Sequence, residues 1–193
     1  MKLRHLASYF KKYPVIPAVR DMELLEEAMG KKEAVIIFLL AGSIFDLKEA
    51  MELAHKNDKI LMINIDLLKG IAHDKKGIEY LAENNLCDGI ISTKSYLIKI
   101  AHKNDLMTIQ RIFLLDSGSL TSAKKMLGDR SVDAVEILPA IAAPYFIKKS
   151  NQQKNHNYQI IAGGLVEEKE EIEYLVDKGV FAISTSRQEL WNY

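Results

Sequence analysis

The chain has 193 residues, which is long enough for one domain and too short for two of ordinary size. Acidic and basic residues number 26 each, so the formal net charge is zero and no overall field attracts the protein to nucleic acid or anionic lipid. Any polyanionic partner must therefore be met by a local patch. Hydrophobic residues make up 48% of the chain, which excludes the disordered and collagenous classes.

Targeting and crosslinking signals are absent from the sequence. No apolar run approaches the ~18 residues needed to cross a bilayer, and residues 1–12 lack the apolar region of a signal peptide. The single cysteine, Cys87, excludes an internal disulfide, which agrees with a reducing compartment. We therefore expect a cytoplasmic protein without a membrane segment.

Short apolar runs recur along the chain, and runs of this kind are typical of strands covered on both faces. The expected strands cover residues 15–18, 35–40, 60–65, 89–91, 107–115, 134–138, 159–162 and 180–184. Helical patterns lie between them. Asp21 caps a first helix that stops at Gly30, and Asp46 with Glu49 forms a capping-box-like start of the next. Later helices are expected near residues 75–84, 95–103, 119–127, 142–150 and 167–177, with Gly128 and Gly179 at two carboxyl ends.

A strand, a helix and a strand repeated at roughly 24-residue spacing indicate parallel strands joined by right-handed crossovers. Such a chain folds as an open doubly wound sheet or as a closed barrel. Eight strands favour the barrel, and the chain lacks the fingerprints G-x-G-x-x-G and G-x-x-x-x-G-K-[ST] of nucleotide-binding open sheets. We expect an α/β fold, a compact single-domain (β/α)8 TIM-like barrel with parallel strands over residues 13–193, preceded by an N-terminal extension, residues 1–12.

The segments after the seventh and eighth strands have the pattern of a phosphate site. In TIM-like barrels these two loops usually hold phosphate. Here Ala162-Gly163-Gly164-Leu165 follows the seventh strand, and Ser184-Thr185-Ser186 follows the eighth. Consecutive glycines let backbone N–H groups approach an anion, and hydroxyls add neutral donors. The alternative is a tight glycine turn followed by hydroxyls that cap the last helix.

Further polar residues follow other strands and converge on the same face, as in a small-molecule site. They are Arg20 after the first strand, Asp66 with Lys69 after the third, Thr93 with Lys94 after the fourth, Gln110-Arg111 with Asp116 at the fifth, and Glu136 at the sixth. Asp66 and Lys69 either grip ligand hydroxyls or serve as an acid–base pair in an enzyme. The alternative is a helix-capping aspartate beside a solvated lysine.

The sequence gives little support for a metal site or a catalytic nucleophile. The histidines have no metal-ligand spacing and no G-x-S-x-G elbow is present, so we expect no metal, no cofactor and no catalytic residue. Cys87 is most simply a small core residue. Arg111 and Glu136 fall on adjacent strands inside core segments, which predicts an interior ion pair. Trp191 is expected to anchor the final short helix on the barrel.

Basic pairs recur on the expected helix surfaces, and a solvated helix face explains each of them most simply. They are Lys11-Lys12, Lys75-Lys76, Lys124-Lys125 and Lys148-Lys149. If the protein binds RNA, the contact must come from local lysines, with Lys94 and the last two pairs as candidates.

An ordered set of segments resembles one protein family. The set consists of Ile16-Pro17-Ala18-Val19-Arg20, Asp66-Leu67-Leu68-Lys69-Gly70, Gly89-Ile90-Ile91-Ser92-Thr93-Lys94-Ser95, Ile109-Gln110-Arg111-Ile112-Phe113-Leu114-Leu115-Asp116-Ser117, Val135-Glu136-Ile137-Leu138-Pro139, Ala162-Gly163-Gly164-Leu165, Ser184-Thr185-Ser186 and Leu190-Trp191. It runs from about Val15 to Trp191 and closely resembles the glycerol uptake operon antiterminator regulatory protein family, the GlpP family.

The resemblance implies a cytoplasmic regulator with a TIM-like barrel that responds to glycerol 3-phosphate and acts on leader mRNA to prevent transcription termination. Combined with the residues above, it predicts a phosphate site at the two glycines and the following hydroxyls, and a hydroxyl site at the aspartate–lysine pair. The predicted ligand-binding residues are Arg20, Asp66, Lys69, Thr93, Gly163, Gly164, Thr185 and Ser186. The chain departs from the family pattern at Ala41-Gly42-Ser43 and at Asn64, where the family has a histidine, so the identity of the ligand stays open.

A second function class also stays open. It is a TIM-barrel enzyme, an isomerase or aldolase acting on a small phosphorylated substrate, with Lys69 or Glu136 as the base. The chain shows no RRM, KH or OB signature for RNA binding and no unmistakable acid–base constellation for catalysis. The sequence leaves a homo-oligomer open as well.

Overall fold

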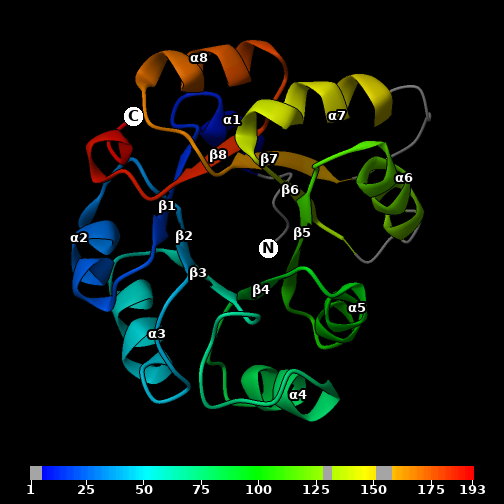
Figure 1. Cartoon of the computed structure of the whole chain (residues 1–193). Coiled ribbons are helices and arrows are strands. Elements are labelled where there is room, and N and C mark those ends of the chain that lie inside the picture. Colours follow the sequence, from blue (N-terminus) through cyan, green and yellow to red (C-terminus); the bar gives the residue numbers. More distant parts are fainter. Residues whose placement is uncertain (1–5, 128–131, 151–157) are drawn as a thin grey trace.

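The structure, a computed structural model, describes residues 6–127, 132–150 and 158–193, and the strands among them form a closed barrel (Figure 1). The strands are β1 (Val15–Val19), β2 (Ile36–Leu39), β3 (Ile60–Asn64), β4 (Gly89–Ser92), β5 (Met107–Phe113), β6 (Ala134–Leu138), β7 (Gln159–Gly163) and β8 (Ala182–Thr185). Each pairs in parallel with the next, and β8 closes on β1 with Val15 opposite Ile183. The sheet is therefore closed and has no open edge, which confirms the predicted (β/α)8 barrel.

Helices alternate with the strands close to the expected ranges. They are α1 (Ala7–Phe10), η2 (Met22–Leu24), α2 (Leu25–Gly30), α3 (Leu47–Lys56), α4 (Lys75–Glu83), α5 (Ser95–Lys103), α6 (Ser117–Met126), η3 (Ala140–Ala142), α7 (Ala143–Ser150), α8 (Lys169–Asp177) and η4 (Gln188–Leu190). Gly179 has a φ of +87° just after α8, which is the predicted left-handed position. Gly30 is instead the last residue of α2, and Gly128 lies outside the described residues.

Local side-chain caps begin several helices. Asp116 and Ser119 form a reciprocal capping box at the start of α6. The box predicted at Asp46 and Glu49 is wrong, because the Asp46 carboxylate makes no cap bond to α3. It instead accepts from the backbone N–H of Ser43 at 2.7 Å and from the Ser43 hydroxyl at 2.8 Å. The aspartate therefore closes the loop after β2 instead of the first turn of the helix.

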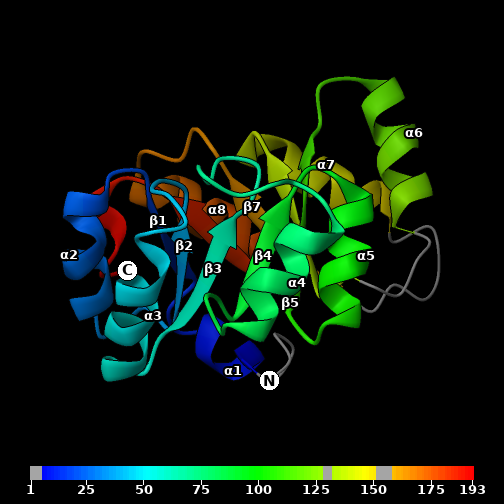
Figure 2. The same cartoon turned by 90° about the horizontal axis from the view of Figure 1, so that it is seen from below.

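Alternate strand residues fill the barrel interior, since successive side chains of a strand point to opposite faces. The inward set forms a buried apolar cluster that includes Ile16, Phe38 and Ile109. At the amino ends of the strands α1 lies beneath the barrel (Figure 2), and its Phe10 packs on Phe181 with ring centroids 5.0 Å apart. Apolar side chains of the described residues thus pack at this end of the barrel.

The outward set packs against the helices in a second buried cluster. Trp191 belongs to it, is 1% exposed, and donates from Nε1 to the carbonyl of Thr185 at 2.9 Å. This contact confirms the predicted anchor after η4. Cys87 is also buried there, and burial raises the pKa of its thiol to about 12, as expected for an inert core residue. No helix in the described ranges is long and apolar enough to span a membrane.

Candidate functional site

A cavity of about 400 Å³ opens at the carboxyl ends of the strands. Its walls come from β1, β5 and β6 and from the loops that follow β7 and β8. The volume falls in the range of small-molecule sites in proteins, and the position is the one where TIM barrels place their sites. The lining contains arginine, glutamate, hydroxyl and glycine residues.

A buried ion pair forms the floor of this cavity. Arg111 on β5 lies opposite Glu136 on β6 in the sheet register, and its Nε donates to Glu136 Oε2 at 2.6 Å. The Ser184 hydroxyl donates to the other carboxylate oxygen, also at 2.6 Å. Gly163 is required beside them, because a Cβ at that position would lie 2.4 Å from Ser184 Oγ and 2.8 Å from Glu136 Oε1. The predicted interior ion pair is confirmed.

The Arg111 guanidinium has donors to spare. It carries five N–H groups, and its one hydrogen bond within the described residues comes from Nε. The side chain is 8% exposed and lines the cavity, so its Nη groups are largely removed from bulk water. Buried donors require acceptors, and a multidentate anion supplies several at once. Arg111 is therefore the strongest anion-binding candidate in the cavity.

The loop after β7 presents further donors to the same cavity. Gly164 has a φ of +79° and Leu165 a φ of +59°, two successive left-handed residues. The backbone N–H groups of Gly164, Leu165 and Ser186 form no hydrogen bond within the described part of the chain. The start of α8 is different, since Glu171 accepts from the N–H groups of Glu167 and Glu168. The amides of Gly164, Leu165 and Ser186 are thus available to an anion, whereas those of Glu167 and Glu168 are already used.

The charges around the cavity have a small positive excess. Arg20, Arg111 and Arg187 face Glu136 and Glu167, which leaves one unmatched positive charge in the lining. Arg187 is ion-paired with Glu167. Arg20, at the end of β1, forms no hydrogen bond or ion pair with any residue that the structure describes. A mobile anion is the natural counterion for Arg20.

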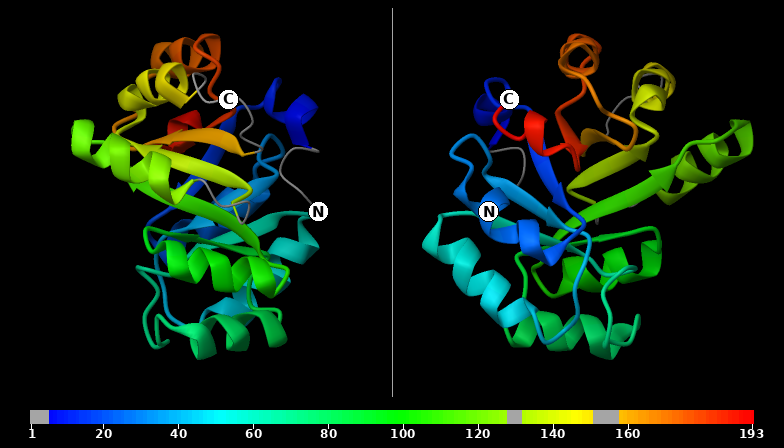
Figure 3. Two further views of the ribbon diagram at one scale, coloured as in Figure 1. Left: turned by 90° about the vertical axis from the view of Figure 1, so that its right-hand side faces the viewer. Right: turned by 60° about the vertical axis from the view of Figure 1, so that its left-hand side comes forward.

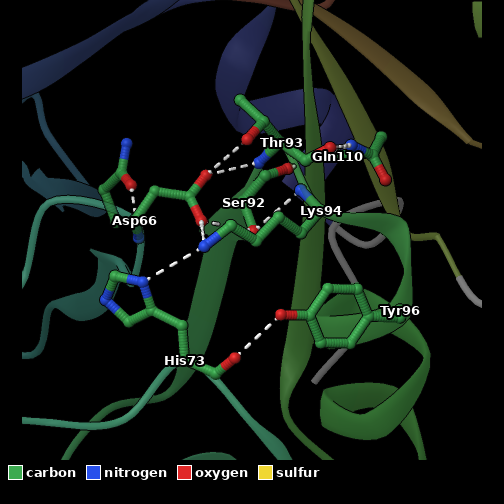
Figure 4. Close-up of polar contacts among 8 residues, drawn as sticks. Asp66, His73, Ser92, Thr93, Lys94, Tyr96 and Gln110 are labelled. Atoms are coloured by element: carbon green, nitrogen blue, oxygen red, sulfur yellow. Dashed lines mark hydrogen bonds and ion pairs between the residues drawn. The ribbon is translucent and has the colours of Figure 1, made fainter.

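A second polar cluster follows β3 and β4 (Figure 4). The Asp66 carboxylate accepts from the Thr93 N–H at 2.6 Å, the Thr93 hydroxyl at 2.8 Å and the Ser92 hydroxyl at 2.9 Å. Lys94 Nζ lies 3.9 Å from Asp66 and 3.2 Å from Nδ1 of His73. Asp66 therefore joins the loops after two neighbouring strands, and its oxygens are already used. It is neither a helix cap nor a partner of Lys69 among the described residues.

The two departures from the family pattern both contact the loop that carries Asp66 and Lys69. Asn64 is 3% exposed, and its side-chain oxygen accepts from the Asp66 N–H at 3.0 Å. Gly42 accepts from the Lys69 N–H at 3.2 Å through its carbonyl. Neither residue lines the cavity. The departures thus alter how this loop is held and leave the lining of the cavity untouched.

Over residues 15–191 the chain matches the sequence profile of the family described as "Glycerol-3-phosphate responsive antiterminator". The chain belongs to this antiterminator family. The resemblance seen in the sequence is confirmed.

Relatives of this antiterminator family are similar over nearly their whole length. The uncharacterized protein YgcP of Escherichia coli (strain K12) is 31% identical over 194 residues, which are 99% of this chain and 96% of YgcP. The crystal structure of a glycerol uptake operon antiterminator regulatory protein from Listeria monocytogenes has a TM-score of 0.85 at 27% identity, over 94% of this chain and 96% of that chain. A glycerol uptake operon antiterminator-related protein from Thermotoga maritima has a TM-score of 0.80 at 30% identity, over 93% and 98%.

The antiterminator fold separates the predicted ligand-binding residues into two groups. Four of them line the cavity: Arg20, Gly164, Thr185 and Ser186. Gly163 packs beneath it, while Asp66, Lys69 and Thr93 lie on the loops after β3 and β4, outside the lining. The prediction that the Thr185 hydroxyl donates to a ligand is wrong. This hydroxyl donates to the carbonyl of Val166 at 2.9 Å, so it is not available to a ligand.

The sequence placed Arg111 among the polar residues of this face and also predicted its ion pair, but it did not predict Arg187 and Leu165 as cavity residues. Strand alternation agrees with the place of Arg111, since Ile109 points inward and Arg111 stands two residues later on the same strand. No sequence signal identified the other two. As for metals, no group of three or more candidate ligands occurs in the described ranges.

Proposed function

We propose that this protein is an antitermination regulator that senses glycerol 3-phosphate in the cavity and acts through leader mRNA. The proposal is supported by membership of the antiterminator family and by one structural observation. That observation is the buried Arg111 guanidinium, which lines the cavity and whose Nη groups have no partner among the described residues. Action on a nascent transcript implies a cytoplasmic protein.

The phosphoryl group is assigned to the deep end of the cavity. Its oxygens accept from Arg111 Nη and from the N–H groups of Gly164 and Ser186, and Arg20 adds charge at the rim. Asp66 and Thr93 act at a distance by holding the neighbouring loops together. Ligand specificity for the glycerol moiety then comes from the part of the cavity between Arg20 and Leu138.

A regulator needs two binding events that influence each other. Binding of ligand changes the affinity for leader RNA by a coupling factor of about 5 to 150, and RNA must change the affinity for ligand by the same factor. Neither event requires turnover of the ligand. Titration of ligand into RNA-bound protein, and of RNA into ligand-bound protein, measures the two factors independently.

Thermal unfolding in the presence of glycerol 3-phosphate, glycerol and inorganic phosphate tests the ligand. A compound that binds only the folded protein raises its stability by RT ln(1 + [L]/Kd), which is about 2.7 kcal/mol at a hundredfold excess over Kd. Glycerol 3-phosphate should stabilise the protein strongly, phosphate weakly and glycerol hardly at all. Equal shifts for glycerol and glycerol 3-phosphate would contradict a phosphate-centred site.

The enzyme alternative has weaker support at the same residues. Glu136 is held by Arg111 and Ser184, so its carboxylate is occupied and is a poor base. Lys69 is exposed and lies outside the cavity lining. Two results together would favour an isomerase or aldolase over the regulator. The protein would turn over a phosphosugar in a reaction that Glu136→Gln or Lys69→Met abolishes, and it would bind no RNA at low salt.

A further inference from the structure

Three consecutive helices carry lysine without any carboxylate. The helices α5, α6 and α7 contain no aspartate or glutamate within their bounds. Their lysines number six: Lys99, Lys103, Lys124, Lys125, Lys148 and Lys149. This run of basic helices is a property of one sector of the barrel and is invisible in the zero net charge of the chain.

The other helices of comparable length mix or reverse the charge. α3 pairs two lysines with two glutamates, and α8 has one lysine against four carboxylates. On α4, Lys75 and Lys76 both form ion pairs with Glu79, so this predicted basic pair is neutralised locally. Lysines at helix carboxyl ends interact favourably with the helix dipole, but α4 and α8 have no basic residue in the last turn. A dipole effect alone therefore does not account for the basic sector.

The three helices are neighbours in space as well as in sequence. They follow one another around one side of the barrel in Figure 1, and the left panel of Figure 3 shows this side facing the viewer. α6 rises beyond the carboxyl ends of the strands in Figure 2 and buries only Ala123. We call this side of the barrel the α5–α7 face, and the six lysines on its helices are exposed or partly exposed.

Aromatic rings accompany the lysines on this face. Tyr145 on α7 is 53% exposed, and Tyr96 on α5 is 50% exposed, with its hydroxyl donating to the carbonyl of His73 before α4 at 2.8 Å. The ammonium of Lys149 lies 5.6 Å from the centroid of the Tyr145 ring. Lysines that neutralise phosphates beside half-exposed rings that stack on bases are the combination used to bind single-stranded nucleic acid.

We propose that the α5–α7 face binds the leader RNA, an inference that rests on the proposed function and names the surface for it. The chemistry fits a polyanion with accessible bases, because the face offers positive charge and aromatic rings and has no carboxylate on its helices. The acidic α8 repels the same partner. RNA therefore lies on one side of the barrel.

The cavity and this face share two strands. β5 carries Arg111 into the cavity and leads into α6, and β6 carries Glu136 and leads through η3 into α7. An anion that draws the Arg111 guanidinium away from Glu136 acts on both strands at once. The helices that hold Lys124, Lys125, Lys148 and Lys149 directly follow these strands, so ligand occupancy has a short route to the RNA-binding face.

The test measures binding of a fluorescein-labelled RNA with a single-stranded leader and an intrinsic terminator hairpin, in saturating glycerol 3-phosphate, from 50 mM salt upward. The test variant is the fourfold change of Lys124, Lys125, Lys148 and Lys149 to glutamine. The matched control is Lys48→Gln with Lys56→Gln on α3, which lies across the barrel (Figure 1). Thermal unfolding with and without glycerol 3-phosphate reports folding and the ligand site of each variant.

The fourfold variant should bind RNA more weakly than the parent. The slope of its plot of log K against log salt should be shallower by about 3, since each of the four lost phosphate contacts on a single strand removes about 0.7 from the slope. The control should bind like the parent, and ligand-induced stabilisation should be equal in all three. Hydrogen exchange of the parent should show RNA-dependent protection in α5, α6 and α7, a measurement that needs no variant.

Several results would overturn the inference in distinguishable ways. If the parent binds RNA and the fourfold variant binds it with unchanged affinity and slope, the surface is wrong and the proposed function stands. If the ligand-saturated parent binds no RNA at 50 mM salt, the proposed function fails and this surface fails with it. If RNA binding is unchanged but the variant loses affinity for phosphatidylserine vesicles, the face is a membrane surface instead.

Discussion

The Arg111–Glu136 pair allows the structural and ligand-binding roles of one residue to be separated. In Arg111→Met the Glu136 carboxylate, 1% exposed, keeps the Ser184 hydroxyl as its one side-chain partner among the described residues. Removing one partner of a buried pair typically costs about 3–5 kcal/mol, whereas replacing both is often close to neutral. We therefore expect the Arg111→Met variant to be strongly destabilised. The free energy of unfolding of the double variant, Arg111→Met with Glu136→Gln, should lie within about 2 kcal/mol of the parent value.

Ligand binding should respond differently in the same variants. A hydrogen bond to a charged group contributes about 1.5–3 kcal/mol, so loss of the Arg111 contact should weaken glycerol 3-phosphate binding by about 2 kcal/mol, roughly thirtyfold. At a hundredfold excess over the parent Kd, stabilisation should fall from about 2.7 to about 0.9 kcal/mol in the double variant. Glu136→Gln alone should show more ligand-induced stabilisation than the parent, because the anion then replaces the missing counterion.

Urea unfolding with and without glycerol 3-phosphate measures both quantities in one assay, with the slope of the transition as a check on two-state behaviour. Arg20→Gln serves as the control for stability alone, since it removes an exposed cavity arginine without leaving a buried charge unpaired. The reasoning is refuted if the folded double variant keeps the full stabilisation by glycerol 3-phosphate, because the anion would then be held elsewhere.

Three further outcomes follow from single positions. Gly164→Ala should destabilise the protein by about 1–2 kcal/mol and weaken ligand binding, because its φ is +79° and a Cβ there would lie 3.4 Å from Leu138; equilibrium unfolding and ligand titration measure this. Trp191→Phe should cost about 1–3 kcal/mol in urea unfolding, since the Thr185 carbonyl loses its indole donor. Cys87 should resist alkylation in the folded protein, and with a pKa raised from 9.0 to about 12 it should lower stability as pH rises through that window; Cys87→Ala should make this slope shallower by the cysteine's part.

The barrel could be predicted because its signals are local and repeated. Buried parallel strands need near-continuous apolar runs, and each crossover needs one amphipathic helix, so the order of elements carries the topology. The helix over Ser95–Lys103 was predicted at its observed bounds. The capping box at Asp46 was predicted wrongly because the pattern is ambiguous. An aspartate before a helix serves equally well to close the preceding loop, as Asp46 does through Ser43.

The site was only partly predictable, because side-chain partners depend on contacts across strands. The sequence identified Gly164 and Ser186 from their place after β7 and β8, where the fold brings loops together. It did not reveal that the Thr185 hydroxyl would be used by Val166, or that Asp66 would join Thr93 on the neighbouring loop. These hydrogen bonds connect residues far apart in the chain, and no local spacing encodes them.

Zero net charge argues against a polyanion partner only if charge is spread evenly over the surface. In this barrel it is segregated, since α8 carries four carboxylates against one lysine while α5, α6 and α7 carry lysines alone. At a Debye length of about 8 Å in physiological salt, an RNA strand on the basic side is largely screened from carboxylates that lie more than that distance away. The local charge of each side, and not the zero net charge of the chain, therefore decides whether a polyanion can bind there.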